Sequence, residues 1–212
     1  MATRRAVSNP LALAVLASLR ERPMHPYEIS TTLRQRGKHE SININYGSLY
    51  NVVDALVRKG LITPKETTRE GKRPERTVYQ LTAAGRTELE DWMAELLGTP
   101  AREYSAFEAG LSLAPVLPPD EVADLLDERS KRLRIELKQW EALKDSVSGL
   151  PRLFWIEGEY HFALRGAELE YVIKLRDDIR SGALEGVDVW RQIHNTQTED
   201  GGLPQIDFDL NV

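Results

Sequence analysis

The side chains best suited to chemistry lie in one short stretch, ININYGSLYNVVDALVRKGLI, at positions 42 to 62. Asparagine, serine and tyrosine donate and accept hydrogen bonds, and they can contact phosphates and the edges of bases. They do not form the paired acids or the activated nucleophile that catalysis requires. We therefore expect a binding surface made of Asn45, Tyr46, Gly47, Ser48, Tyr50 and Asn51.

Aliphatic residues of the same stretch predict how this surface is held. They recur at the i, i+3, i+4, i+7, i+8 spacing of one buried helical face: Leu49, Val52, Val53, Leu56 and Val57. The residues at the head of this helix are weak helix formers, so contact is a better explanation for them than helix stability. A small glycine and the free N–H groups of a helix start favour a phosphate.

No catalytic or metal-binding pattern appears elsewhere. The four histidines, His25, His39, His161 and His194, are scattered without metal-ligand spacing. Because there are no cysteines, disulfides, thiolate nucleophiles and cysteine metal sites are excluded. The GKRPER segment lacks the Ser/Thr and the preceding glycine of a phosphate-binding P-loop. We expect no enzyme, no metal and no cofactor.

Two helices are predicted before this stretch. Asn9 and Pro10 begin the first, which carries LALAVLASL and stops before Pro23. A second helix is expected from Pro26 to about Gly37, with Tyr27, Ile29 and Leu33 turned inward. Gly60 then follows the third helix as its C-cap.

A β-hairpin and a fourth helix follow. LITPKE and TVYQLT are predicted strands around an exposed basic turn, TTREGKRPER. Thr82 caps the next helix, whose apolar side carries Leu89, Trp92, Met93, Leu96 and Leu97. This order is that of a winged helix, in which the third helix enters the DNA major groove. We expect Lys72, Arg73 and Arg76 of the wing to contact phosphates, the alternative being a solvated turn.

Charge is divided along the 212 residues. Residues 1–87 hold 15 lysines and arginines against seven acidic residues, a formal +8, and the remainder carries −13, giving −5 in all. This asymmetry favours a polyanion-binding part joined to an acidic part, although an uneven surface without function is the alternative.

Three segments resemble the PadR-type transcriptional regulators. These are HPYEI at 25–29, GSLYNVVDALVRKGLI at 47–62 and RPERTVYQLTAAGR at 73–86. In that family a G-x-LY motif opens the recognition helix and a Y-x-L-T-x-x-G motif leaves the wing. The resemblance covers roughly the first 95 residues and implies a dimeric DNA-binding protein, usually a repressor, often released by a small aromatic or drug-like ligand.

The second half predicts long helices. From Pro119 to Val147 an apolar stripe recurs at seven-residue steps, through Leu126, Leu133, Trp140 and Val147. It is a candidate dimer seam, and packing against the chain's own next helix, at about 152–181, is the alternative. The segment from Leu184 is expected to be irregular.

The sequence therefore predicts a mainly α-helical fold with a small β-hairpin wing. Residues 1–98 would form a winged helix-turn-helix DNA-binding domain and residues 99–212 a helical dimerisation domain. We expect a cytoplasmic homodimeric repressor that binds an inverted-repeat operator, without a membrane span, and responds to a small aromatic effector. Trp92 would either wall the ligand site or belong to ordinary helix core. A winged-helix protein-interaction module without operator binding is the alternative function.

Overall fold

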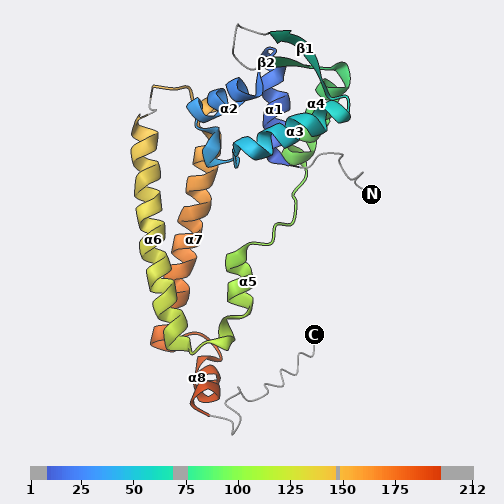
Figure 1. Cartoon of the computed structure of the whole chain (residues 1–212). Helices are drawn as coiled ribbons and strands as arrows, with labels where there is room; N and C mark the ends of the chain where they lie inside the picture. Colours follow the sequence, from blue (N-terminus) through green and yellow to red (C-terminus); the bar gives the residue numbers. More distant parts are fainter. Residues whose placement is uncertain (1–8, 69–75, 147–148, 197–212) are drawn as a thin grey trace. The chain divides into compact units, whose positions relative to one another are not determined.

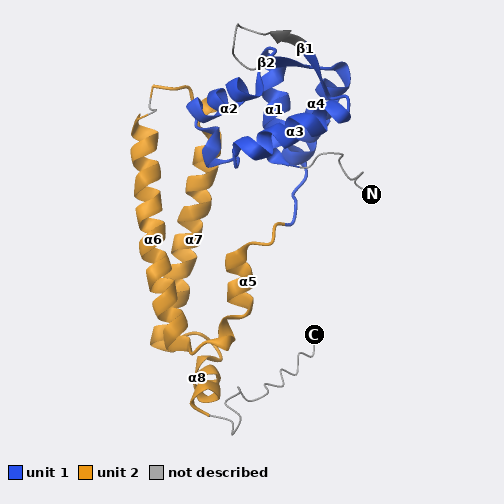
Figure 2. Ribbon diagram, in the orientation of Figure 1, with its two compact units in different colours: residues 1–102 blue, residues 103–212 orange. Residues whose placement is uncertain are grey.

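The chain divides into two compact units, residues 1–102 and 103–212 (Figures 1 and 2). This computed structural model describes residues 9–68, 76–146 and 149–196. The described residues are mainly helical with one two-stranded antiparallel hairpin, which confirms the predicted fold class.

Three helices and a short 3-10 turn open the first unit. They are α1 (Pro10–Glu21), α2 (Pro26–Gln35), η1 (Lys38–Glu40) and α3 (Tyr46–Arg58). Asn9 caps α1, because its side-chain oxygen accepts a hydrogen bond from the Leu11 N–H at 2.9 Å. The predicted left-handed glycine after α3 is confirmed, with φ of +69° at Gly60.

The wing is an antiparallel pair of strands, β1 (Ile62–Thr68) and β2 (Arg76–Leu81). The segment between α1 and α2 adds to it, since the backbones of Met24 and Tyr79 exchange two hydrogen bonds of 3.0 and 3.1 Å. The base of the wing is thereby fixed to the helices that carry the candidate surface.

The Leu81–Gly85 segment joins the wing to α4 (Ala83–Gly98) by a close backbone contact. The Thr82 hydroxyl accepts from the Gly85 N–H at 3.0 Å and lies 2.8 and 2.9 Å from the carbonyl oxygens of Gly60 and Leu61. A Cβ atom on Gly85 would lie 2.0 Å from the Leu61 oxygen, so no other residue fits without movement. The glycine of the Y-x-L-T-x-x-G motif is thus a packing requirement.

The core of the first unit confirms most of the predicted α3 face and corrects part of the α4 face. Leu49, Val52, Val53 and Leu56 are buried, and Val57 is partly buried against them. On α4, Leu89 and Trp92 are buried, but the expectation for Met93, Leu96 and Leu97 was wrong: all three are exposed.

The second unit is helical. Its elements are α5 (Ala106–Ser112), η2 (Ala114–Val116), α6 (Pro119–Ser146), η3 (Arg152–Phe154), α7 (Ile156–Ser181) and α8 (Val187–Asn195). The expectation of irregular structure from Leu184 was wrong for α8, while residues 197–212 lie outside the described part of the chain. The helix expected to begin near Arg152 is divided into η3 and α7.

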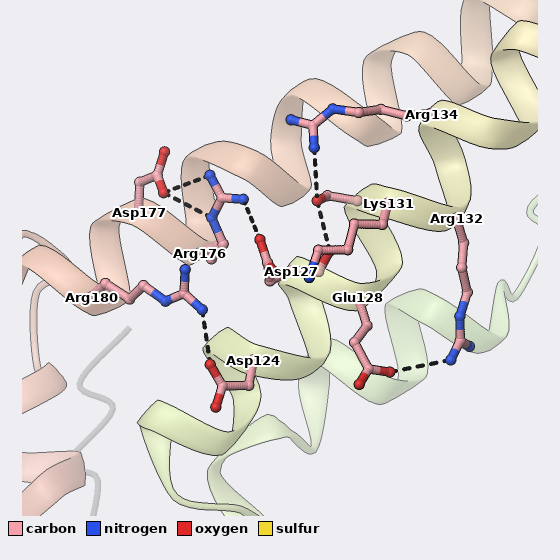
Figure 3. Close-up of polar contacts among 10 residues, drawn as sticks. Asp124, Asp127, Glu128, Lys131, Arg132, Arg134, Arg176, Asp177 and Arg180 are labelled. Atoms are coloured by element: carbon pink, nitrogen blue, oxygen red, sulfur yellow. Dashed lines mark hydrogen bonds and ion pairs between the residues drawn. The ribbon is translucent and has the colours of Figure 1, made fainter.

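An antiparallel ladder of ion pairs aligns α6 with α7 (Figure 3). Asp124 pairs with Arg180 at 2.8 Å and Asp127 with Arg176 at 2.7 Å. Further along, Glu168 pairs with Arg129, and Glu136 pairs with Arg165 at 3.1 Å. As the position on α6 rises, its partner on α7 falls, so a slip of one helix along the other would break every pair.

The apolar stripe of α6 faces the chain's own core. Leu126 and Leu133 are each only 4% exposed and cluster with Val172 and Ile179 of α7. Trp140 packs against Trp155 at 5.6 Å and His161 at 4.5 Å between ring centroids. Val147 lies outside the described residues. These α6 side chains thus hold the α6–α7 pair together within one chain.

Candidate nucleic-acid interface

The head of α3 presents a continuous polar surface. All six residues expected there are exposed, and their buried neighbours Leu49, Val52 and Val53 anchor the opposite face of the helix. The set comprises Asn45, Tyr46, Gly47, Ser48, Tyr50 and Asn51. The structure therefore brings together, on one helix start, the residues that sequence reasoning placed in one site.

Asn45 has a structural task as the N-cap of α3. Its side-chain oxygen accepts hydrogen bonds from the N–H groups of Gly47 at 2.9 Å and Ser48 at 3.4 Å. These two donors are occupied by the cap and are not both free for a phosphate, which narrows the anion-binding role predicted for the helix start. The amide nitrogen of Asn45 keeps its two donors.

Gly47 lies in an open part of this surface. A Cβ atom built on it would meet only the Asn45 side-chain oxygen at 3.5 Å, an ordinary contact, and its backbone is helical. The fold of this unit therefore does not require glycine at position 47. A close approach by a binding partner at Gly47 stays a prediction from the sequence.

Sequence reasoning missed an aromatic and cationic group beside the α3 head. Tyr27 was expected inside but is 59% exposed, and its ring stacks on Tyr46 with centroids 6.1 Å apart. Arg34 lies over the other ring, 5.6 Å from the Tyr46 centroid, and donates to the Ile44 carbonyl oxygen at 2.6 Å. Helical spacing alone indicates that Tyr27 is exposed, because it lies about 200° around α2 from the buried Ile29.

One acidic side chain also faces outward on α3. Asp54 is exposed, and burial raises the pKa of the nearby Tyr79 hydroxyl, with the negative charge of Asp54 adding to the effect. A carboxylate at this point disfavours a phosphate but can accept a hydrogen bond from a cytosine amino group. The exposed face of α3 therefore carries hydrogen-bonding groups suited to base edges as well as to phosphates.

Of the three wing residues predicted to contact phosphates, only Arg76 lies within the described part of the chain. Lys72 and Arg73 lie outside the described residues, and Arg76 is the first residue of β2, paired through its backbone with Thr68. Their contact with phosphate stays a prediction from sequence.

Trp92 belongs to the core of the first unit, with 5% of its surface exposed. Its membership of a ligand site stays a prediction. Among residues 9–68, 76–146 and 149–196, no group of three or more acidic, histidine or cysteine side chains is arranged to hold a metal ion. No helix in these ranges is both long and apolar enough to cross a bilayer.

The chain is similar to known regulators in sequence and fold. Residues 15–91 match the transcriptional regulator PadR-like family. Bacillus subtilis PadR in complex with operator DNA is 19% identical, with a TM-score of 0.64 over 80% of this chain and 98% of that chain. The same protein in complex with p-coumaric acid is 16% identical, with a TM-score of 0.64 over 82% of this chain and 98% of that chain.

A third similar structure is the Vibrio cholerae virulence activator AphA. It is 17% identical, with a TM-score of 0.59 over 81% of this chain and 98% of that chain. No match was found among curated proteins. At these identities the structures establish the fold. The match to the transcriptional regulator PadR-like family, over residues 15–91, lies within the winged-helix unit of this chain.

Proposed function

We propose that this protein is a sequence-specific DNA-binding transcriptional regulator that acts as a homodimeric repressor. The observation that carries the proposal is that the polar head of α3 is exposed while the opposite face of this helix is buried. Ser48, Tyr50 and Asn51 project from a helix whose other face is buried, as in a helix that enters the major groove. The net positive charge of residues 1–87 supports attraction to a polyanion.

Binding to genomic DNA tests this proposal. The protein is incubated with fragmented genomic DNA from its source, and the recovered sites are sequenced and aligned. An enriched inverted repeat with half-sites about 34 to 36 Å apart, or a multiple of this spacing, is expected from a two-fold helix-turn-helix dimer. Recovery of fragments without any shared sequence would contradict it and favour the protein-interaction function.

The dimer contact we propose lies on α7 and not on the buried α6 stripe. Tyr160, Leu164 and Ala167 are exposed on α7 at i, i+4 and i+7, so they form one apolar stripe at coiled-coil spacing. Leu126 and Leu133 are buried within their own chain, so they are not available to a partner. A second copy would remove the α7 stripe from water.

A charge placed in that stripe tests the contact. Leu164→Lys should convert a dimer to a monomer in light scattering, because the lysine would be buried against the partner. Phe162→Lys is the matched control, since Phe162 is exposed and lies about 200° around α7 from Tyr160. A monomeric mass for the unaltered protein at micromolar concentration, or an unchanged mass in Leu164→Lys, contradicts this interface.

Repression and release by a small aromatic ligand complete the proposal. The structure of Bacillus subtilis PadR in complex with p-coumaric acid supports an aromatic effector. The same fold also occurs in an activator, Vibrio cholerae AphA, so the fold alone does not distinguish repression from activation. A reporter gene behind the recovered site should be silenced by the protein. A ligand that relieves silencing must favour the non-binding state by a few kcal/mol.

Trp92 provides the test of where such a ligand acts. If a panel of planar aromatics, p-coumaric acid included, changes neither the fluorescence of the protein nor its operator affinity, the effector is excluded. If Trp92→Phe responds to the panel as the unaltered protein does, Trp92 is core only.

A further inference from the structure

Two concave pockets of the helical unit differ in the chemistry of their walls. One, of about 510 Å³, lies between α5 and α6, and Arg129, Arg132 and Arg165 are among its lining residues. The other, of about 420 Å³, is lined by the α5–η2 segment, the beginning of α6, the end of α7 and α8. We call this second cavity the α8 pocket. Its volume falls within the usual range of small-molecule sites.

Hydrogen bonds hold the walls of the α8 pocket in place. The Trp190 indole N–H donates to the Leu117 carbonyl oxygen at 2.8 Å, and His194 Nε2 lies 2.9 Å from the Pro115 oxygen. Arg191 donates to the Ile179 oxygen at 3.0 Å. These hydrogen bonds join α8, labelled in Figure 1, to η2, to the segment before α6 and to the end of α7, so the pocket is formed before a ligand arrives.

Apolar side chains dominate the lining of the α8 pocket. Leu111, Val122, Leu175, Ile179 and Ile193 contribute to it, with the rings of Tyr171 and Trp190 as aromatic walls. Because the Trp190 N–H already has a partner, the ring offers the ligand an apolar surface. Such walls fit a ligand with an aromatic or aliphatic body.

A single carboxylate sets the charge of this pocket. Among the described residues that line it, Glu185 is the only one with a formally charged side chain. Within the described part of the chain, the Glu185 carboxylate has no hydrogen bond or ion pair, and it is exposed at the rim. An anionic ligand would find no cation in this lining, whereas an ammonium group would find an acceptor.

The pocket between α5 and α6 does not favour an anionic ligand, although three arginines line it. Its arginines already have acidic partners: Arg129 pairs with Glu168, Arg132 with Glu128 and Arg165 with Glu136 and Glu168. A carboxylate ligand there would have to compete with these internal partners.

We propose that the α8 pocket binds a small apolar amine, with its hydrocarbon body between Tyr171 and Trp190 and its ammonium group at Glu185. This binding site is independent of DNA binding, so it can be tested without an operator.

Three probes of nearly equal size test the proposal by isothermal titration calorimetry on the full chain. They are 1-naphthylmethylamine, 1-naphthalenemethanol and 1-naphthoate, which are cationic, neutral and anionic. The amine should bind about two- to fivefold more tightly than the alcohol, as an exposed ion pair contributes. The naphthoate should bind more weakly than the alcohol.

Variants at the rim separate charge from shape. Glu185→Gln should bring the amine to the affinity of the alcohol, and Glu185→Lys should place the naphthoate above the amine. Val189→Trp, on an exposed pocket residue, should weaken all three probes at least about tenfold by filling space. Val116→Trp is the control, being exposed but outside the lining of either pocket, and it should leave binding unchanged.

Four results would overturn the proposal. They are no heat from any probe up to about 1 mM, naphthoate binding as well as the amine, probe affinities unaffected by Val189→Trp, and a loss of dimer mass in Val189→Trp. The last result would assign the pocket to a second copy of the chain. None of these results bears on the α3 surface, because the measurement contains no DNA.

Discussion

The rings of Tyr27 and Tyr46 stack with their centroids 6.1 Å apart and their planes inclined by 17°. This contact joins the first turn of α2 to the first residue of α3 across an exposed surface. It positions Tyr46 at the head of α3, and Arg34 lies over the same ring. The two helices therefore present one surface, and contacts by the α3 head depend on α2.

Tyr27→Ala should weaken DNA binding by about two- to twelvefold, since loss of an aromatic contact costs about 0.5 to 1.5 kcal/mol. Tyr27→Phe keeps the ring and should bind nearly as the unaltered protein does. Fluorescence anisotropy on the recovered operator gives the affinities, and a double-mutant cycle with Tyr46→Ala should show a coupling of at least about 0.5 kcal/mol. Strict additivity of the two alanine changes would show that the stack does not position Tyr46.

Two variants separate the capping role of Asn45 from its proposed role in DNA binding. Asn45→Ala should destabilise the first unit by about 1 kcal/mol because the N–H groups of Gly47 and Ser48 lose their acceptor. Asn45→Asp keeps the cap and should retain stability, but its added negative charge should weaken DNA binding. Urea unfolding and anisotropy measured on the same two variants separate the effects. Equal stability of all three proteins would contradict the cap.

Gly47→Ala should stabilise the protein slightly and weaken operator binding. The new methyl group meets only the Asn45 oxygen at 3.5 Å, so the fold accepts it, and alanine favours the helix by up to about 1 kcal/mol. The same methyl group would obstruct close approach of DNA backbone. Thermal unfolding and operator affinity are the measurements, with Gly98→Ala, also in open space at the end of α4, as the control. Undiminished operator affinity in Gly47→Ala would show that no close approach occurs there.

Glu168 should make the helical unit sensitive to acid. Burial raises the pKa of this carboxyl, but hydrogen bonds from Arg129 and Arg165 outweigh burial, so its pKa lies below the ordinary value of 4.5. Because the folded pKa is lowered, the stabilisation is complete above pH 4.5 and is lost as the pH falls through the folded value.

Glu168→Gln should therefore lower the free energy of unfolding at pH 7 by about 1 to 2 kcal/mol and reduce its loss between pH 5 and pH 3. Glu128→Gln removes the mostly exposed pair with Arg132 and should change stability by less than about 0.5 kcal/mol. Urea unfolding followed by circular dichroism across this pH range gives both quantities. If the free energy of unfolding changes with pH in the same way for Glu168→Gln and for the unaltered protein, Glu168 is not the source of the acid sensitivity.

The winged-helix elements were predictable because their signals are local. Asn9, Thr82 and Gly60 end or begin helices by contacts within a few residues, and Leu49 to Val57 repeat at helical spacing. The exposed site residues followed from the same repeat. Tyr27 was predicted wrongly, although it lies about 200° around α2 from the buried Ile29.

The short helices of the second unit depend on distant contacts instead. Arg129 lies over the Phe107 ring of α5 at 3.8 Å, and Trp190 of α8 bonds to Leu117, which is 73 residues away. The left-handed turns at Gly182 and Gly186 lead from α7 into α8, which was not predicted from the sequence. Likewise, the repeat of Leu126 and Leu133 could not show whether α6 faces a second chain or its own α7, since both partners demand the same spacing.

The central claim is that the α3 head reads DNA sequence, and Asn51→Ala tests it most directly. Affinity for the recovered operator and for a random duplex is measured at several salt concentrations, with Arg73→Ala of the predicted wing for comparison. Asn51→Ala should lose about 1 to 3 kcal/mol on the operator alone and keep its salt slope, because an asparagine amide pairs with an adenine edge. Arg73→Ala should weaken both duplexes and lower the slope by about one unit. If Asn51→Ala weakens operator and random duplex equally, α3 does not read sequence and the account is contradicted.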